Sequence, residues 1–339
     1  MQSLTAHSSD RRPDLLAADV EANICRLEHP RPTFRSVMPE ANRKREIAGN
    51  GPQRALDTVP LIDIRNLTVT FGDTRILRGI DLAIEPGESV GLIGGSGSGK
   101  SITWLAAMGL LPKTAQIGGS VLLRGSEILG APRTSLERLR GGTIGIVFQD
   151  AAAALNPVRS VGWQIAEVLQ LHRGMVGQSA QDEAKRLLDL VGIPEARRRL
   201  GSYPFELSGG QNQRVMIAMA LAAQPAILIA DEPTTGLDVT IQAQILDLLR
   251  TLRRETGMAL VMISHDLGVI SDVCERTYVM DAGMVVEEIS VRDLHTSPKH
   301  SYTKRLVAAA PAWNLGGHLT DHAESPGPAP VRAAIENAA

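Results

Sequence analysis

A glycine-rich loop constrains this chain more than any other stretch, because it lies between a short apolar run and a helical run. The apolar run, 89–93, has the length of a buried strand, and the helical run covers 101–111. The loop fits the pattern G-x-x-x-x-G-K-[ST], in which backbone N–H groups and a helix N-terminus bind phosphate. We therefore predict a strand–loop–helix unit of an α/β fold with a phosphate site. The loop residues are Gly94, Gly95, Ser96, Gly97, Ser98, Gly99, Lys100 and Ser101.

Two side chains of this loop and two later carboxylates supply the other groups of a nucleotide site. We expect Lys100 to bridge the β- and γ-phosphates of a bound nucleotide and the Ser101 hydroxyl to bind Mg²⁺. The apolar run 227–230 predicts a buried strand that ends in Asp231 and Glu232. A parallel strand delivers its last residues to the sheet edge where ligands bind. Asp231 is therefore expected to hold Mg²⁺, and Glu232 to polarise the attacking water as general base.

Charge and cysteine content narrow the range of partners. The chain has 339 residues, and 35 Lys and Arg against 37 Asp and Glu give a formal net charge of −2. We expect no nucleic-acid partner, because no whole-protein positive field exists to hold one. The two cysteines, Cys25 and Cys274, have no second ligand at metal-binding spacing, which argues against a disulfide scaffold or zinc site. No stretch approaches the roughly 18 apolar residues of a membrane-spanning helix.

The order of strand and helix signals predicts the organisation of the chain. Strand patterns at 61–71 and 76–84 indicate an antiparallel lobe ahead of the loop, and helical patterns fill 151–223. Strands then alternate with helices from 226 onward, which is typical of a parallel sheet. We thus predict an α/β P-loop NTPase fold of the RecA-like kind, with a parallel-sheet core, an N-terminal antiparallel β subdomain and an inserted α-helical subdomain.

Local composition predicts where order begins and ends. Residues 1–58 are polar and lack apolar periodicity, and 311–339 are rich in Gly, Pro and Ala, so both are expected to be tails. Within the helical segment, Ser179 and Asp182 fit an S-x-x-D capping box at a helix start.

A second glycine-rich motif carries a family resemblance. Residues 207–211, Leu-Ser-Gly-Gly-Gln, open a predicted helix over 211–223 and resemble the signature motif of ABC ATPases. The resemblance covers about 61–311 and implies a nucleotide-binding domain over 59–310 that hydrolyses ATP with Mg²⁺. It also implies a second ATPase subunit packed head to tail, so that each ATP lies between the loop of one subunit and the signature of the other. The signature residues expected to contact ATP are Ser208, Gly209, Gly210 and Gln211.

The same resemblance implies roles for four further residues. Gln149 is similar to the Q-loop glutamine that touches Mg²⁺ and the catalytic water. Asp238 lies in a stretch that resembles the D-loop, and His265 resembles the switch histidine that contacts the γ-phosphate. Phe71 precedes Lys100 where the family keeps an aromatic that stacks on adenine.

Longer stretches resemble the ATPase subunits of dipeptide and oligopeptide importers. These stretches are 148–150, 155–157, 213–221, 238–246 and 300–303. They imply an ATPase on the cytoplasmic face of the inner (plasma) membrane, peripheral to it, that powers solute import. The implied partners are two permeases, a second ATPase and, indirectly, an extracytoplasmic solute-binding protein. One departure is Gly95, which stands where the family usually has Glu.

Alternatives differ in cargo and in class. Nickel and glutathione importers share much of the same pattern, so the cargo is open. A soluble ABC ATPase acting on ribosomes or DNA typically has two cassettes or a long coiled coil, whereas the segment from Ser101 to Ser208 has room for one helical lobe. A non-hydrolysing adaptor would not need Glu232 and His265.

Overall fold

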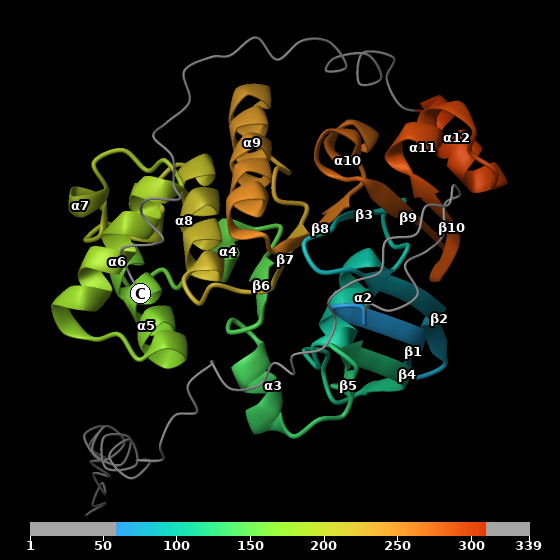
Figure 1. The fold of residues 1–339 in the computed structure, drawn as a ribbon, viewed down its shortest axis with the longest axis horizontal. Helices are drawn as coiled ribbons and strands as arrows, with labels where there is room; N and C mark the ends of the chain where they lie inside the picture. Colours follow the sequence, from blue (N-terminus) through green and yellow to red (C-terminus); the bar gives the residue numbers. More distant parts are fainter. Residues whose placement is uncertain (1–58, 310–339) are drawn as a thin grey trace, which may run out of the picture. The chain divides into compact units, whose positions relative to one another are not determined.

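The computed structural model describes residues 59–309. The tails predicted for 1–58 and 311–339 lie outside these residues. Two sheets and a group of helices make up the described part (Figure 1). None of its helices combines the length and apolar character needed to cross a bilayer.

The first sheet is antiparallel and has the strand order β2-β1-β4-β5. It confirms the predicted N-terminal β lobe, since the patterns at 61–71 and 76–84 form a hairpin. The register shifts between Ile64 and Leu67, where Asn66 adopts a positive φ of 48°. The strands are β1 (Ile62–Phe71), β2 (Thr74–Ile84), β4 (Ala115–Leu123) and β5 (Ser126–Glu127).

The second sheet has the order β10-β9-β3-β8-β7-β6 and confirms the predicted parallel core. Five neighbouring strands run parallel, and β10 pairs antiparallel with β9 at one edge. The strands are β3 (Ser89–Ile93), β6 (Ile144–Val147), β7 (Ile227–Asp231), β8 (Ala259–Ser264), β9 (Arg276–Asp281) and β10 (Met284–Ser290).

Helices cover the parallel sheet and form a separate lobe. In Figure 1, α5, α6, α7 and α8 gather on the yellow-green side, away from β1, β2 and β4. This lobe agrees with the helical subdomain predicted at 151–223. The helices are α2 (Lys100–Ala107), α3 (Arg133–Leu139), α4 (Ala151–Ala154), α5 (Val161–Arg173), α6 (Gly177–Leu190), α7 (Ala196–Arg199), the 3₁₀ turn η1 (Pro204–Glu206), α8 (Gly209–Leu221), α9 (Val239–Thr256), α10 (Leu267–Val273), α11 (Val291–Thr296) and α12 (Ser301–Ala309).

Alternate residues of each central strand enter different cores, because successive side chains of a strand point to opposite faces. In β7, Leu228 and Ala230 pack with the helical lobe, α9 and α10. Ile227 and Ile229 pack on the other face with α2 and the antiparallel sheet. Trp104 of α2 is 4% exposed in this second core. The parallel sheet is therefore covered on both faces, which explains its nearly continuous apolar strands.

Two local predictions are wrong at helix ends. Ser179 is not a cap, because α6 already begins at Gly177, and the Ser179 hydroxyl donates to the Val176 carbonyl instead. Helix α2 ends at Ala107 rather than at 111. Gly109, with a φ of 61°, breaks the helical backbone there.

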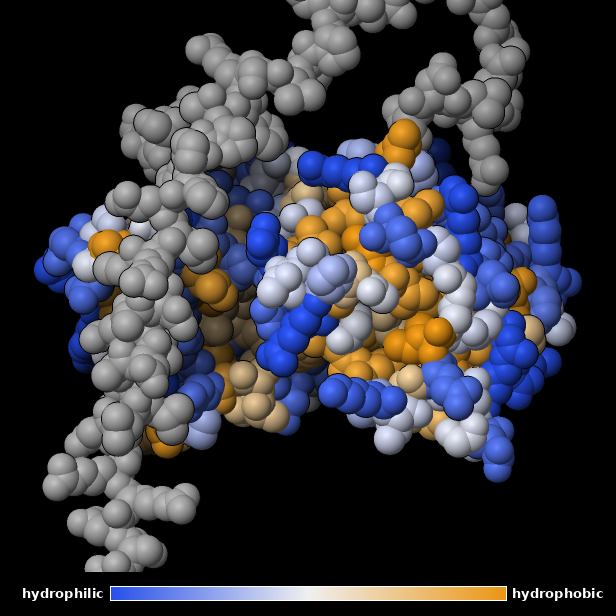
Figure 2. All heavy atoms as spheres, turned by 90° about the horizontal axis from the view of Figure 1, so that it is seen from below, coloured by the Kyte–Doolittle hydropathy of each residue, from blue (hydrophilic) through white to orange (hydrophobic). Residues whose placement is uncertain are grey.

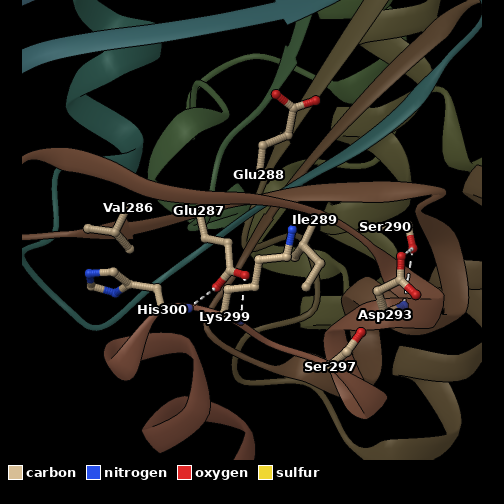
Figure 3. Close-up of a pocket in the computed structure, with 9 residues that line it drawn as sticks. All are labelled: Val286, Glu287, Glu288, Ile289, Ser290, Asp293, Ser297, Lys299 and His300. Carbon is tan, nitrogen blue, oxygen red and sulfur yellow. Dashed lines mark hydrogen bonds between the residues drawn. The ribbon is translucent and has the colours of Figure 1, made fainter. Parts of the chain in front are cut away.

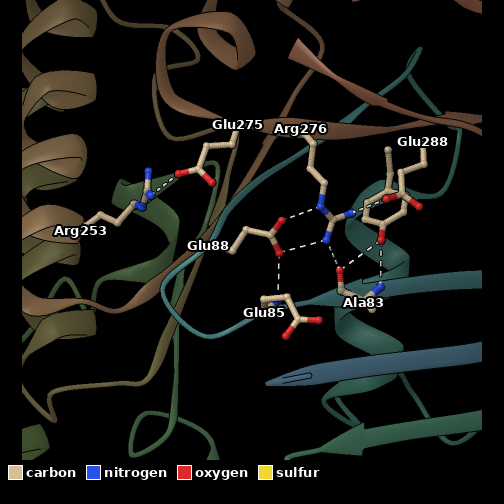
Figure 4. Close-up of polar contacts among 8 residues, drawn as sticks. Ala83, Glu85, Glu88, Arg253, Glu275, Arg276 and Glu288 are labelled. Atoms are coloured by element: carbon tan, nitrogen blue, oxygen red, sulfur yellow. Dashed lines mark hydrogen bonds and ion pairs between the residues drawn. The ribbon is translucent and has the colours of Figure 1, made fainter. Parts of the chain in front are cut away.

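A polar network joins the two sheets around Arg276 (Figure 4). Its guanidinium donates to both carboxylate oxygens of Glu88, at 2.5 and 3.0 Å, and to the Ala83 carbonyl at 2.6 Å. It also lies over the ring of Tyr278, with Cζ 4.8 Å from the centroid. Both partners of the ion pair are largely buried, at 20% and 14% side-chain exposure. The network therefore ties β2, the turn before β3 and β9 together.

We predict that Arg276→Gln lowers the free energy of unfolding by about 2 kcal/mol, because Glu88 then remains largely buried without its charged partner. The matched control is Arg250→Gln, whose ion pair with Asp247 is longer, at 3.6 Å, and more exposed. Its cost is expected to be below about 0.5 kcal/mol. Urea unfolding followed by circular dichroism measures both. Equal losses would contradict the role given to the network.

Candidate nucleotide-binding site

The glycine-rich loop joins β3 to α2 as predicted. Steric contacts and backbone conformation explain why two of its positions are glycine. A Cβ on Gly94 would lie 2.2 Å from the Met280 carbonyl oxygen. Gly99 has a φ of 104°, and a Cβ there would lie 2.6 Å from Leu77 Cδ2. Glycine is therefore required at both positions, by close approach at the first and by backbone conformation at the second.

Lys100 turns back onto its own loop. Its Nζ donates to the carbonyl oxygens of Gly94 at 2.8 Å and Gly95 at 3.0 Å, and the residue is 7% exposed. Burial lowers the pKa of Lys100, while the charges of Glu232 and Asp231 oppose that shift. Lys100 is thus a buried donor between a phosphate loop and two carboxylates.

The Glu232 carboxylate contacts side chains that follow three neighbouring strands. Its Oε2 accepts from Gln149 Nε2 at 3.1 Å and from Thr235 Oγ1 at 3.0 Å, and its Oε1 lies 3.1 Å from His265 Nδ1. Gln149 follows β6, Glu232 follows β7 and His265 follows β8, and these strands are neighbours in the sheet. Glu232 has a φ of 46°, a left-handed conformation that is unfavourable for a residue with a Cβ. Both carboxylate oxygens are therefore fixed at a strained backbone position.

Asp231, the last residue of β7, has the character of a magnesium ligand. Burial raises its pKa, whereas a hydrogen bond from Ser101 opposes the shift. Its Oδ1 is buried and has no hydrogen-bond partner. Carboxylate and hydroxyl oxygens with waters are the donor set that Mg²⁺ prefers, so Asp231 and Ser101 fit this ion. The described residues contain no group of three or more His, Cys, Asp or Glu that could hold a metal by itself.

One cavity, of about 570 Å³, brings together eight of the eighteen predicted site residues. Ile102 and Thr235 also line it; Thr235 begins the stretch that resembles the D-loop, but neither residue is among the predicted site residues. Thr235 follows Glu232 by three residues, a spacing at which a turn can return its hydroxyl, but the pattern alone does not reveal that contact. The lining residues are Ser96, Gly97, Gly99, Lys100, Ser101, Ile102, Gln149, Glu232, Thr235 and His265.

The signature residues form a second patch outside this cavity. Ser208 is the N-cap of α8, and its side chain and that of Gln211 bond each other's backbone N–H in a capping box. Gly210 packs against α9, since a Cβ there would lie 2.7 Å from Ile241 Cγ2. A Cβ on Gly209 would lie 3.7 Å from Leu237 Cδ2, an ordinary contact distance. Asp238 caps α9 by accepting from the Ile241 N–H.

Two aromatic residues, Phe71 and Tyr302, lie outside the cavity. Phe71 ends β1 and packs against the second core, and it does not line the cavity. Adenine stacking by Phe71 stays a prediction. Tyr302 of α12 was missed, although its hydroxyl oxygen accepts from the Gly95 N–H at 2.8 Å. No local signal could find this contact, because the two residues are 207 positions apart.

Comparison with known proteins relates this arrangement to one family. The ABC transporter family model matches residues 77–235. The oligopeptide transport ATP-binding protein OppD of Salmonella typhimurium is 47% identical over 276 residues, covering 80% of this chain and 82% of that protein. A putative peptide import ATP-binding protein of Brucella melitensis is 45% identical over 263 residues, covering 74% of this chain and 78% of that protein.

The mycobacterial relatives are longer. OppD of Mycobacterium tuberculosis is 49% identical over 257 residues, and the match covers 74% of this chain and 42% of that protein. The chain therefore matches less than half the length of this relative.

Solved ABC cassettes share the fold. A dimeric ATP-binding cassette in a post-hydrolysis state, bound to ADP and Pi, is similar with a TM-score of 0.61 and 32% identity, covering 68% of this chain and 99% of that chain. The cbiO1 structure from Clostridium perfringens, part of the ABC transporter complex cbiONQ, has a TM-score of 0.61 and 28% identity, covering 70% of this chain and 91% of that chain. The predicted fold class is confirmed.

We predict that Gly94→Ala lowers the free energy of unfolding by about 2–3 kcal/mol, because the new Cβ collides with the Met280 carbonyl. Gly97→Ala is the matched control. It meets nothing within 4 Å but must keep a φ of 77°, so its expected cost is about 1 kcal/mol. Urea unfolding without nucleotide measures both values. A smaller loss for Gly94→Ala than for Gly97→Ala would contradict this account.

Proposed function

Because this chain belongs to the ABC transporter family of ATP-binding proteins, we propose that it hydrolyses ATP to power the import of di- or oligopeptides through partner permeases. The observation that carries the ATPase part is the Glu232 carboxylate, held by Gln149, Thr235 and His265 beside a phosphate-binding loop. The peptide cargo rests on the relatives, which are named as oligopeptide transport and peptide import proteins.

ATP binding uses the loop and Lys100. The start of α2 lines the cavity, and we expect its backbone N–H groups to bind the phosphates there, aided by the partial positive charge of the helix N-terminus. Lys100 now donates to two backbone carbonyls, which are weaker acceptors than phosphate oxygens. We expect Lys100 to leave them for the β- and γ-phosphates.

Magnesium would be held by Ser101, by Asp231 through water, and by Gln149. When bound, the ion neutralises charge on the phosphates. The unpaired Oδ1 of Asp231 is available for it or for a water of its shell. Gln149 already contacts Glu232, so it can move between the carboxylate and the ion without leaving the cavity.

Water activation is assigned to Glu232. Hydrogen bonds donated to the Glu232 carboxylate stabilise its charged form and lower its basicity, so we expect Gln149 and His265 to leave it when ATP and water bind. His265 would then contact the γ-phosphate, and Gln149 would contact the water and the ion. The three hydrogen bonds on Glu232 therefore describe a resting arrangement that ATP must rearrange.

The separate signature patch supports a composite site. Ser208, Gly209, Gly210 and Gln211 lie at the start of α8, and none of them lines the cavity. A second ATPase subunit, packed head to tail, would bring its signature and its Asp238 to this chain's ATP. One of the similar solved structures is a dimeric cassette bound to ADP and Pi, which agrees with such a pairing.

Exposed hydrophobic side chains support a protein partner at the membrane. Figure 2 shows hydrophobic residues gathered in the middle of one face of the molecule, to the right of the helical lobe. Permeases that bury such side chains would hold the chain at the cytoplasmic face, with a solute-binding protein outside selecting the cargo. Several large exposed residues follow β6 or lie in the helical lobe: Phe148, Val158, Trp163, Leu171, Val176, Tyr203 and Phe205.

For the composite site, we predict that Ser208→Ala reduces ATP turnover at least about 10-fold and prevents ATP-driven dimerisation, because a donor to the partner's ATP is lost. Ser160→Ala is the matched control. Ser160 caps α5 as Ser208 caps α8, so both variants lose a similar cap of about 1 kcal/mol. Turnover and size-exclusion chromatography with Mg-ATP are measured for both. Wild-type behaviour of Ser208→Ala would exclude a signature role.

For import, we predict that tagged Glu232→Gln, captured from detergent-solubilised membranes with Mg-ATP, retains two multi-span permeases and a second ATPase. The substitution removes the general base, so ATP persists and stabilises the assembly. Mass spectrometry identifies the partners, and an untagged strain is the control. Recovery of ribosomal or DNA-processing proteins without a permease would refute the transport proposal.

A further inference from the structure

Helix α12 places a tyrosine hydroxyl on the phosphate-binding loop. We propose that Tyr302 is a positioning residue for ATP binding. It holds the Gly94–Gly95 end of the loop in its binding shape when Lys100 turns to the phosphates. This inference rests on the proposed binding of ATP to this loop, and it adds a residue from the C-terminal end of the described chain to that site.

The contact itself is close and specific. The Gly95 N–H donates to the Tyr302 hydroxyl oxygen at 2.8 Å. A Cβ on residue 95 would lie 3.2 Å from that oxygen, closer than most side-chain carbons approach a neighbour. Glycine at this position therefore allows the hydroxyl to reach the backbone without displacement.

The Tyr302 side chain is fixed from several sides. Its ring packs against the first core together with Leu306 and Val307. The Arg305 guanidinium lies 5.7 Å from the ring centroid. A hydroxyl on a ring held in this way costs little entropy to keep in place, so it can act as a fixed acceptor.

The start of α12 is fixed as well (Figure 3). Glu287 of β10 accepts from the Lys299 N–H at 2.7 Å and the His300 N–H at 3.0 Å. His300 Nδ1 in turn accepts from the Tyr302 N–H at 3.2 Å. The Tyr302 backbone is thus linked through His300 and Glu287 to β10, at the edge of the parallel sheet.

The consequence depends on Lys100. In this structure Lys100 donates hydrogen bonds to the carbonyl oxygens of Gly94 and Gly95, and ATP binding would remove both bonds. The Tyr302 contact then remains as a side-chain restraint on Gly95. Tyr302 does not line the cavity that contains Glu232, so its loss should weaken ATP binding without slowing the chemical step.

The test compares Tyr302→Phe with the wild-type full-length chain. We expect the KM for ATP, and the Kd for Mg-ATP from calorimetry, to rise about 3- to 10-fold, with kcat and Tm nearly unchanged. Tyr278→Phe is the matched control, because its hydroxyl also bonds to backbone, at Ala83, but away from the loop. It should lower Tm and leave KM unchanged.

Gly95→Ala gives a second, independent variant. Its new Cβ should push the Tyr302 hydroxyl away and raise the KM for ATP. In the Tyr302→Phe background, Gly95→Ala should raise KM little further, because the hydroxyl oxygen is already absent. If wild type and Tyr278→Phe bind no ATP, the proposed function fails. If they bind ATP and Tyr302→Phe binds it equally well, or loses kcat instead, the positioning role is overturned.

Discussion

The hydrogen-bonded carboxylate of Glu232 is the contact on which the site's arrangement depends. Its two oxygens join groups that follow β6, β7 and β8, and the backbone adopts a left-handed conformation to place it there. Such a conformation costs about 1–2 kcal/mol for a residue with a Cβ. The neighbouring Gln149, Thr235 and His265 offset this cost, and each of them also lines the cavity.

The strand order explains why these groups meet. In the sequence β3-β8-β7-β6 across the sheet, the carboxyl ends carry the phosphate loop, His265, Glu232 and Gln149 as adjacent neighbours. Residues far apart in the chain therefore form one row at a single sheet edge, as expected for ligand sites of parallel sheets. The covered faces of the sheet keep that row rigid, because both cores pack against it.

The sequence predicts features that depend on local pattern and misses those set by tertiary contacts. The strand at 89–93, the loop and the carboxylates that end β7 follow from residue type and spacing, and the structure has them as expected. The cap at Ser179 was wrong because the helix starts earlier, at Gly177. Tyr302 reaches Gly95 across 207 residues, and only the folded chain shows that contact. Separation of the signature patch from the cavity is implied by the family resemblance and not by residue type or spacing, and in the structure none of its residues lines the cavity.

The most direct test of the account is single-turnover ATP hydrolysis by Glu232→Gln, with Mg-ATP affinity measured on the same sample. Glu255→Gln, on the exposed end of α9, is the matched control. If Glu232 is the general base, Glu232→Gln binds ATP as the wild type does but hydrolyses it at least about 100-fold more slowly, while the control stays active. Wild-type turnover by Glu232→Gln would contradict the assignment of this carboxylate to catalysis.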